Sequence, residues 1–503
     1  MVSLPSVSMV KSRILAGVAL IALAMPASAE TLREALVEAY KTNPTLAAQR
    51  DNVRALDENV PLARAPGLPA VQLQSTYSEN FVTSVSSFTA PSRLTNTQGS
   101  FTVPVYAGGG IKNAIAAANT RVEGGRAALR GTEADLFTSV VGAYMDVIRD
   151  ESVVRLNQQN ASVLEVNLQA SKDRFQVGDL TRTDVAQSDA RLALARSQLQ
   201  SAEARLISSR ESYIRLVGSP PGTLQTPPPL PSLPRDPDMA VEIALADNPT
   251  LLAAKKARDA TKFDIRVAKS ERLPRLDAFV QGTYTNFLGT LGAGFIGATF
   301  PQFDRTGQLG LRMTLPLYQG GGPAARVRQA QARRSQALEQ LTEAERGVVA
   351  QVRSAFAVWQ SSLEVIKSAE IAVEANKLAL EGVKAENSVG NRTILEILNA
   401  EQELLNSRVT LVTAQRDAYV AGFALLAATG HAEAKDLGLD AGPLYDPVAN
   451  YDRVHNSLLD WTFGRPAEAV STSTAKTPAQ TAIVAPTVDS ATPNPAGTAP
   501  KDR

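Results

Sequence analysis

The stretch SVGNRTILEILNA, residues 388–400, places a turn directly before a helix with a seven-residue repeat. Val389-Gly390 is a turn signal, because glycine tolerates the positive φ that reverses a chain. Apolar residues then return every seven positions in two neighbouring columns: Ile397, Leu404, Leu411, Ala418 and Leu425, and Leu398, Leu405, Val412, Tyr419 and Leu426. A strict seven-residue apolar repeat imposes coiled-coil contact between helices. We therefore expect this helix to pack antiparallel against the helix before the turn.

The same design occurs twice in the chain. Val177-Gly178 and Thr181 stand 212 positions before Val389-Gly390 and Thr393, and a heptad stretch over residues 185–213 follows them. Near the start, the tetrapeptide NPTL at 43–46 returns at 248–251. A long internal repeat indicates a duplicated architecture. Each half should contain a helical segment (32–63 or 239–272), two strands, a long helix, the Val-Gly turn and a second helix that ends near Gly218 or Gly430.

Two strand pairs are expected, one in each half: residues 71–77 with 100–106, and 276–284 with 309–315. Apolar and polar residues alternate clearly in the first and last of these, as in a strand with one apolar face. Four strands are too few to close a barrel, so a membrane barrel would have to be shared between chains. An ordinary half-buried sheet fits the alternation equally well. Four prolines mark the expected junctions of strands and helices: Pro69, Pro104, Pro274 and Pro316.

The helical content and the helix lengths point away from a compact domain. Residues 111–175, taken as one helix, would be about 100 Å long at about 1.5 Å per residue. A helix of that length suits a protein that bridges a gap such as a periplasm.

The two ends and the middle have distinct compositions. Residues 1–29 contain an apolar run flanked by Lys11 and Arg13 and end in an A-x-A motif, which predicts a cleaved secretion signal. The proline-rich stretch 223–237 predicts an extended linker between a first repeat, 30–222, and a second repeat, 238–430. Residues 431–466 form a C-terminal segment. Residues 467–503, rich in Ala, Thr, Pro and Ser, are predicted to be disordered.

The composition excludes several kinds of chemistry. The chain has no Cys, two His and a net charge of +1, which excludes disulfides and thiol catalysis and argues against a histidine metal site or a nucleic-acid partner. The glycine triplets at 108–110 and 320–322 lack the Gly-Lys-Ser/Thr ending of a phosphate-binding loop. We expect no cofactor, no metal and no catalytic residues.

Five motifs together resemble the TolC family of outer-membrane efflux and type I secretion channels: residues 43–46, 66–69, 105–109, 174–178 and 388–400. The resemblance implies a mainly α fold with a small β part. Long coiled-coil hairpins would form an α-barrel through the periplasm, and three chains would share a 12-stranded transmembrane β-barrel. It implies a homotrimer in the lipid of a Gram-negative outer membrane, with residues 431–466 wrapped around the equator of the tunnel.

The resemblance also implies a function and partners. The channel would conduct drugs or secreted proteins passively from an inner-membrane ABC or RND-type transporter and a periplasmic adaptor (membrane fusion) protein. The alternative is that the chain is itself a periplasmic coiled-coil adaptor or an envelope scaffold. The duplicated strand pair argues against that alternative.

The family motif assigns roles to residues near the helix tips, at Gly178 and Gly390. Arg392 matches an arginine that latches the periplasmic gate by bonding to a Thr-Asp pair, here Thr183-Asp184, and Asn387 stands where some members carry a Tyr that joins this latch. A solvated surface pair worth about 0–1 kcal/mol is the plain alternative.

The motif also implies a ring of acids facing the pore. Glu396 matches the first acid of this selectivity ring, whereas Asn399 replaces the second. Three chains would then contribute three carboxylates instead of six, which predicts weaker cation selectivity and weaker block by multivalent cations than in a relative with both acids. Pro61 should kink or end the first helical segment, and its role stays open.

Overall fold

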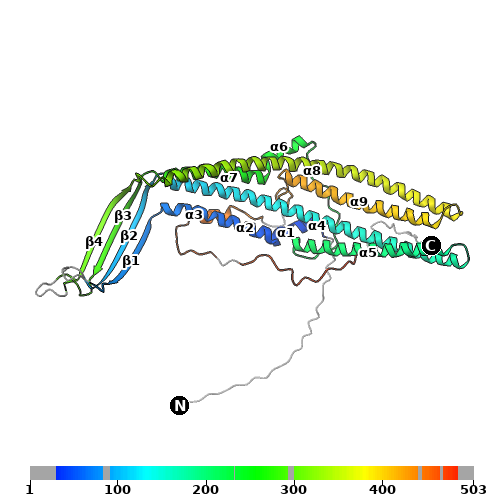
Figure 1. The fold of residues 1–503 in the computed structure, drawn as a ribbon, viewed down its shortest axis with the longest axis horizontal. Coiled ribbons are helices and arrows are strands. Elements are labelled where there is room, and N and C mark those ends of the chain that lie inside the picture. The colour runs from blue at the N-terminus through cyan, green and yellow to red at the C-terminus, as the bar shows by residue number, and fades with distance from the viewer. Residues whose placement is uncertain are drawn as a thin grey trace, which may run out of the picture.

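The computed structural model describes residues 30–82, 91–231, 233–292, 300–439, 444–464 and 468–484. The predicted signal, 1–29, and the last part of the predicted tail lie outside the described residues. The chain forms a long rod of helices with a four-stranded antiparallel sheet at one end (Figure 1).

Two very long helices run the length of the rod. α4 (Gly110–Gln176) and α8 (Gly322–Ser388) each contain 67 residues, which at about 1.5 Å per residue is about 100 Å. In the half of the rod far from the sheet, α5 (Arg182–Val217) packs on α4 and α9 (Ile394–Ala428) packs on α8. The expected mainly helical, duplicated fold is confirmed. No described helix is both long enough and apolar enough to cross a bilayer.

In α9 the heptad column that contains Leu404 and Leu425 packs on α8, whereas the neighbouring column, with Leu398 and Leu426, packs on the first hairpin. Leu192 and Leu206 of α5 and Leu404 and Leu425 of α9 are all less than 5% exposed. Small residues in the neighbouring column, such as Ala195 at 2%, are buried as well. Burial of these side chains is what holds each hairpin together.

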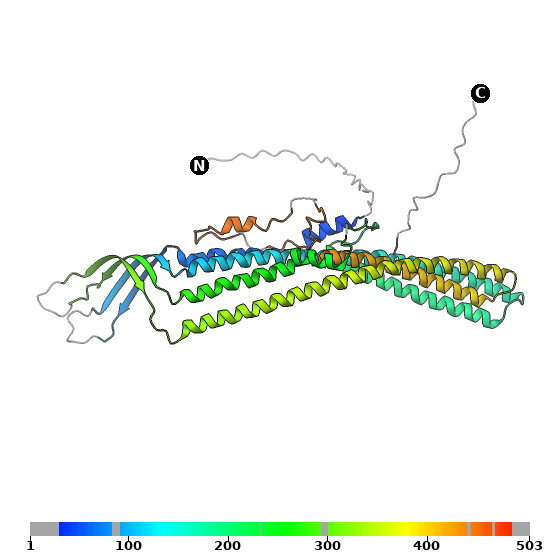
Figure 2. The same ribbon diagram turned by 90° about the horizontal axis from the view of Figure 1, so that it is seen from above.

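The half of the rod next to the sheet is completed by shorter helices. These are α1 (Leu32–Thr42), α2 (Pro44–Asp57) and α3 (Asn59–Arg64) in the first repeat, and α6 (Pro237–Asp247) and α7 (Pro249–Ser270) in the second. α7 packs against both α4 and α8, and α2 and α3 pack against α4. Figure 2 shows α4, α7 and α8 fanning apart toward the sheet.

The segments expected to be helical, 32–63 and 239–272, are helical, and each divides at an Asn-Pro pair. Asn43 ends α1 and caps α2, accepting from the Thr45 N–H at 2.9 Å, while its amide donates to the Leu216 carbonyl at 2.9 Å. Asn248 repeats this arrangement with the Ala428 carbonyl. Proline disfavours helical geometry at the residue before it and suits the first position of a helix. Each break therefore also ties a short helix to the end of the second helix of its own half.

Pro61 lies in a third short helix. α2 ends at Asp57, and Pro61 falls in the first turn of α3, where proline leaves no needed N–H unpaired. The 3₁₀ turn η1 (Ala65–Gly67) then leads into the sheet.

The four strands form one sheet in the order β1 (Ala70–Glu79), β2 (Arg93–Ala107), β3 (Arg275–Asn286) and β4 (Phe303–Thr314). Pairing of β2 with β3 joins the two repeats. Pro104, expected at a junction of strand and helix, lies inside its strand instead, since β2 continues to Ala107 across an irregularity between Pro104 and Tyr106. Proline is tolerated there because β1 begins pairing only at Thr102, which leaves Pro104 with a neighbour on one side.

The register sorts the strands' side chains onto two different faces. Val71, Phe101, Val280 and Leu309 lie opposite one another across all four strands. The same face carries further apolar residues: Leu73, Tyr77, Val103, Leu311 and Met313. The other face is mostly polar: Gln72, Gln74, Gln98, Ser100, Thr102, Gln281, Thr283, Thr306 and Gln308.

Different parts of the C-terminal segment pack at different places along the rod. Ala432, Ala434 and Leu439 are buried in the central core with Leu36 and Phe137, whereas α10 (Ala449–Val454) packs on α2, nearer the sheet. Residues 468–484, part of the predicted disordered tail, have defined contacts with α5 (Arg210 donates to the Thr481 carbonyl at 2.5 Å).

Candidate functional site

The two hairpin tips, at the end of the rod far from the sheet, are built alike (Figure 1). Gly178 ends the first long helix with φ of +88°, and Gly390 ends the second with φ of +78°. The N–H groups of Asp179 and Asn391 donate back to the Arg174 and Glu386 carbonyls at 2.9 and 3.0 Å. A Cβ at either glycine would meet no atom within 4 Å. The backbone conformation, and not a lack of space, therefore requires glycine at both tips.

Capping boxes start the helices that return from the tips. Asp184 Oδ2 accepts from the Thr181 hydroxyl at 2.7 Å and from the Thr181 N–H at 2.9 Å. Glu396 accepts from the Thr393 N–H at 3.2 Å in the equivalent position. The hydrogen bonds from the Thr181 side chain and backbone lower the pKa of Asp184. Both acids named in the sequence analysis thus stabilise helix starts.

Arg392 is held inside its own tip. Its Nε lies 2.6 Å from Glu386 Oε2 and its Nη1 lies 3.4 Å from Glu396 Oε1, and the bond to Glu386 raises the pKa of Arg392. Asn387 donates to the Arg392 carbonyl at 2.7 Å. Among the described residues of this chain, Arg392 bonds to neither Thr183 nor Asp184.

A different arginine crosses between the two hairpins near the tips. Arg191 of α5 donates to Asn399 Oδ1 of α9 at 2.6 Å. Beside this bond, Leu398 is 1% exposed and packs on Leu192 and Ala195 of α5. Arg191 was not among the site residues predicted from the sequence. The one available signal was its position next to the heptad residue Leu192, where charges flank a coiled-coil seam.

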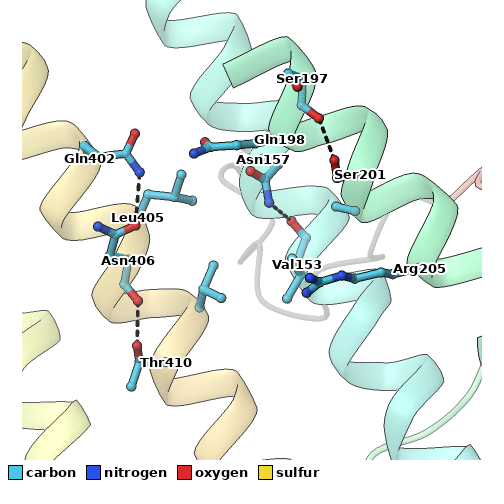
Figure 3. A pocket seen from close by; sticks show the side chains of 12 residues that line it. Val153, Asn157, Ser197, Gln198, Ser201, Arg205, Gln402, Leu405, Asn406 and Thr410 are labelled. Atoms are coloured by element: carbon cyan, nitrogen blue, oxygen red, sulfur yellow. Dashed lines mark hydrogen bonds between the residues drawn. The ribbon is translucent and has the colours of Figure 1, made fainter. Parts of the chain in front are cut away.

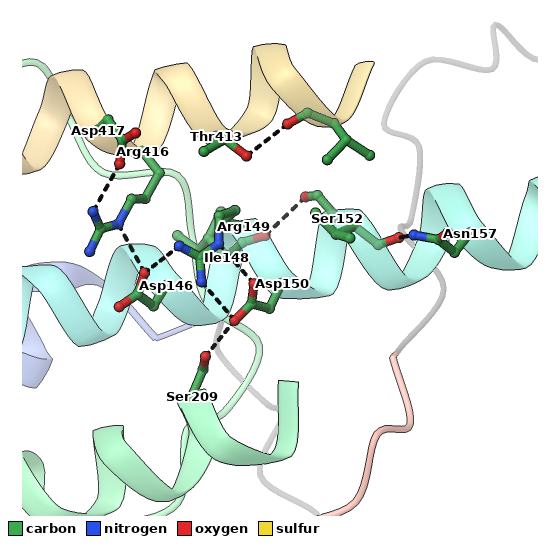
Figure 4. A network of polar contacts seen from close by, with 12 residues as sticks. Asp146, Ile148, Arg149, Asp150, Ser152, Asn157, Ser209, Thr413, Arg416 and Asp417 are labelled. Atoms are coloured by element: carbon green, nitrogen blue, oxygen red, sulfur yellow. Dashed lines mark hydrogen bonds and ion pairs between the residues drawn. The ribbon is translucent and has the colours of Figure 1, made fainter. Parts of the chain in front are cut away.

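An ion network joins three helices near the middle of the rod (Figure 4). Arg416 of α9 lies 2.9 Å from Asp146 of α4, which also pairs with Arg149 at 2.8 Å. Asp150, which Arg149 binds through two nitrogens, accepts from the Ser209 hydroxyl of α5. The hydrogen bond to Asp150 raises the pKa of Arg149. The network is a second link between the two hairpins, and the sequence analysis missed it.

A groove of about 480 Å³ separates the hairpins between these two links (Figure 3). Its lining comes from α4, α5 and α9 and combines polar with apolar residues: Asn157, Ser197, Gln198, Ser201, Arg205, Gln402, Asn406 and Thr410 with Val153, Ala202, Leu405 and Val409. Throughout the described ranges, no group of three or more His, Cys, Asp or Glu residues is placed to hold a metal. The arrangement therefore consists of two tip turns, two sets of contacts between the hairpins and a groove.

Comparison with known proteins points in one direction. A family model described as "Outer membrane efflux protein" matches residues 35–219 and 240–431. The chain is 32% identical over 432 residues to outer membrane efflux protein BepC of Brucella suis, which covers 85% of this chain and 91% of that protein. It is 28% identical to outer membrane protein TolC of Escherichia coli, over 92% of this chain and 97% of that one. The crystal structure of VceC from Vibrio cholerae has the same fold, with a TM-score of 0.68 at 21% identity over 79% of this chain and 96% of that one.

Proposed function

This chain belongs to the outer membrane efflux protein family, and on that premise we propose that three copies form a passive export channel with a gate at its periplasmic end. The sheet of each copy would supply a third of a 12-stranded barrel in the outer membrane. The helices would form a tunnel through the periplasm toward an inner-membrane transporter and its adaptor. Those partners would supply the energy, and the cargo would be drugs or secreted proteins.

The two faces of the sheet carry this proposal. Leu309 is 82% exposed and Val71 is 79% exposed on the apolar face, which is costly in water and favourable against lipid. The polar face suits a water-filled lumen. β4 has 12 residues, or about 40 Å at about 3.3 Å per residue, and a tilt of about 40° brings this close to the 30 Å of a bilayer core. A periplasmic adaptor would have no use for such a face.

The free edges of the sheet support a shared barrel. β1 and β4 each have a neighbour on one side only, and an unpaired edge exposes a row of hydrogen-bonding groups. A bilayer core has no water to satisfy those groups, so the edges must pair with other strands. Symmetric copies of the same chain can close such a ring.

The gate would lie at the tips. Arg392 has no bond to Thr183 or Asp184 of its own chain, so we place the predicted latch between neighbouring subunits, where Arg392 would exchange its pairing with Glu386 for one with Asp184. A charge-assisted bond of this kind is reversible. Within each subunit, Arg191 and Asn399 would hold the hairpins together. Three copies of Glu396 would form the selectivity ring.

The proposal is tested by single-channel recording in planar lipid bilayers, with the wild type beside Arg392→Ala. A small wild-type conductance that rises in the variant would support both the channel and the latch. Equal conductance in both proteins would remove Arg392 from the gate. Well-reconstituted protein without conductance in either form would refute the channel.

The ring has its own test. Glu396→Gln should reduce block by multivalent cations added from the side of the tips, because the ring loses its carboxylates. Unchanged block would contradict the role given to Glu396. Thr393 caps the same helix, so Thr393→Ala serves as a control for damage to the helix start.

A further inference from the structure

The segment after α10 carries large apolar side chains that none of the described residues covers. Leu458 is 63% exposed, Leu459 75%, Trp461 87% and Phe463 83%. Asp460 is the one charged residue among 457–463. Exposed apolar patches with this aromatic content mark interaction sites.

The segment follows α10, which hydrogen bonds attach to α2 and α4. The Asn450 amide donates to Asp57 of α2 at 2.8 Å, and the Tyr451 hydroxyl donates to Asn119 of α4 at 3.0 Å. Val454 is buried, and the ring of Tyr451 packs with Val60 and Val122. The chain therefore leaves α10 at a defined place and in a defined direction.

That place is next to the junction of rod and sheet. Arg64, the last residue of α3, donates to Asn456 Oδ1 at 2.5 Å. β1 begins six residues after Arg64, at Ala70, so Arg64, the partner of Asn456, lies within about 20 Å of the first strand at about 3.3 Å per residue. Figures 1 and 2 show α10 alongside α3, with the chain leaving it on the side of the sheet. Residues 457–463 can reach the level at which the strands meet the helices.

The junction already has the chemistry of a membrane surface. Tyr106, near the end of β2, and Tyr318, just beyond β4, occupy equivalent positions in the two repeats and are 49% and 87% exposed. Leu317 is 89% exposed beside Tyr318, and Leu62 on α3 is 67% exposed. Tyr and Trp gather where a bilayer meets water, since their rings are partly apolar and partly polar.

We propose that residues 458–463 form an interfacial anchor, in which Leu458, Leu459, Trp461 and Phe463 insert into the periplasmic leaflet of the outer membrane around the foot of the barrel. The occupant of this surface is lipid, because the segment lies near the junction, whose exposed aromatic and apolar side chains have the same character. The inference rests on the proposed function, which places the sheet in the bilayer. Because Asn450 and Tyr451 attach α10 to α2 and α4, such an anchor would fix the tilt of the helical rod against the membrane.

The chain offers a direct probe, because it contains two tryptophans, Trp359 on α8 and Trp461. In the full-length variant Trp359→Phe, Trp461 is the single tryptophan. The protein is reconstituted into phosphatidylethanolamine–phosphatidylglycerol vesicles without brominated lipid, with lipids brominated near the headgroup end of the acyl chains for Trp461, or with lipids brominated near the middle of the chains for position 309. Bromine quenches tryptophan on contact, so an interfacial Trp461 should lose about half of its emission or more.

Two further single-tryptophan proteins, both made in the Trp359→Phe, Trp461→Phe background, separate the possible failures. Leu309→Trp on the apolar face should be quenched, whereas Ile371→Trp, on α8 away from the sheet, should not. If Leu309→Trp is not quenched, the proposed function fails. If Leu309→Trp is quenched and Trp461 is not, the anchor is overturned while the function stands. A Trp461 that is shielded from acrylamide yet unquenched by bromine is covered by protein, which also overturns the anchor.

Discussion

Arg191→Met should open the channel by separating the hairpins at their tips. Methionine keeps an unbranched apolar stem and removes the guanidinium that binds Asn399. The bond is partly exposed, so its loss should cost about 1 kcal/mol per chain. Three copies would shift the balance between closed and open tips by about 3 kcal/mol, or roughly 100-fold.

The assay is the open fraction of single channels in planar bilayers at fixed voltage. Arg196→Met is the matched control, because Arg196 also lies on α5 but pairs with Glu165 of its own hairpin at 2.9 Å. Arg191→Met should raise the open fraction and Arg196→Met should leave it near the wild-type value. Equal open fractions in the two variants would refute the reasoning that the cross-hairpin bond holds the tips.

The same bond allows a reciprocal experiment. The chain has no cysteine, so Arg191→Cys with Asn399→Cys provides a single pair for a short bismaleimide cross-linker. Linking the hairpins should lower the conductance, and the unlinked double variant should show a raised conductance. A cross-linked channel that conducts like the unlinked one would show that opening does not require the hairpins to separate here.

Burial raises the pKa of Glu133 to about 7 from an ordinary value of 4.5. The folded chain therefore keeps this proton up to a higher pH than the unfolded chain does. The free energy of unfolding falls as the pH rises from about 4.5 to about 7. Glu133→Gln should flatten that fall and stabilise the protein at pH 8 by about 1–3 kcal/mol, which thermal unfolding followed by circular dichroism would detect; an unchanged pH profile would contradict it. Leu309→Lys should cost about 2–4 kcal/mol of insertion into lipid and reduce the yield of membrane-assembled trimer, whereas Gln308→Lys on the polar face should be tolerated; equal yields would argue against the assigned faces. Gly430→Ala, whose Cβ would lie 2.6 Å from the Asp247 carbonyl oxygen, should lower Tm more than Gly390→Ala, which pays only for its positive φ; the reverse order of Tm values would refute this.

The strongest sequence predictions concern features that repeat locally. The seven-residue columns identified the long helices and their antiparallel pairing, because each helix must bury a continuous apolar stripe against its partner. The Val-Gly turns and the helix ends at Gly218 and Gly430 follow from the positive φ that these glycines adopt. The internal repeat also predicted that both halves would be built alike.

Details inside the expected elements depend on patterns that compete locally. The expected helical segments are helical, and Asn-Pro geometry divides each of them at Asn43 or Asn248. The gate roles of Asp184 and Glu396 remain predictions, and the structure adds a capping bond within its own helix for each. The pairing of Arg392 with Asp184 remains a prediction about neighbouring subunits.

The duplicated helical plan, the turns and the existence of four strands could be predicted from the sequence, because each depends on residues a few positions apart. The single sheet with one apolar and one polar face could not be predicted, since it depends on the register between β2 and β3. Only the tertiary structure shows that Arg191 meets Asn399, 208 positions away, and that Arg416 meets Asp146. Such pairs depend on how each helix is rotated about its axis. The packing of many side chains sets that rotation, and no periodicity in the sequence specifies it for a single polar contact.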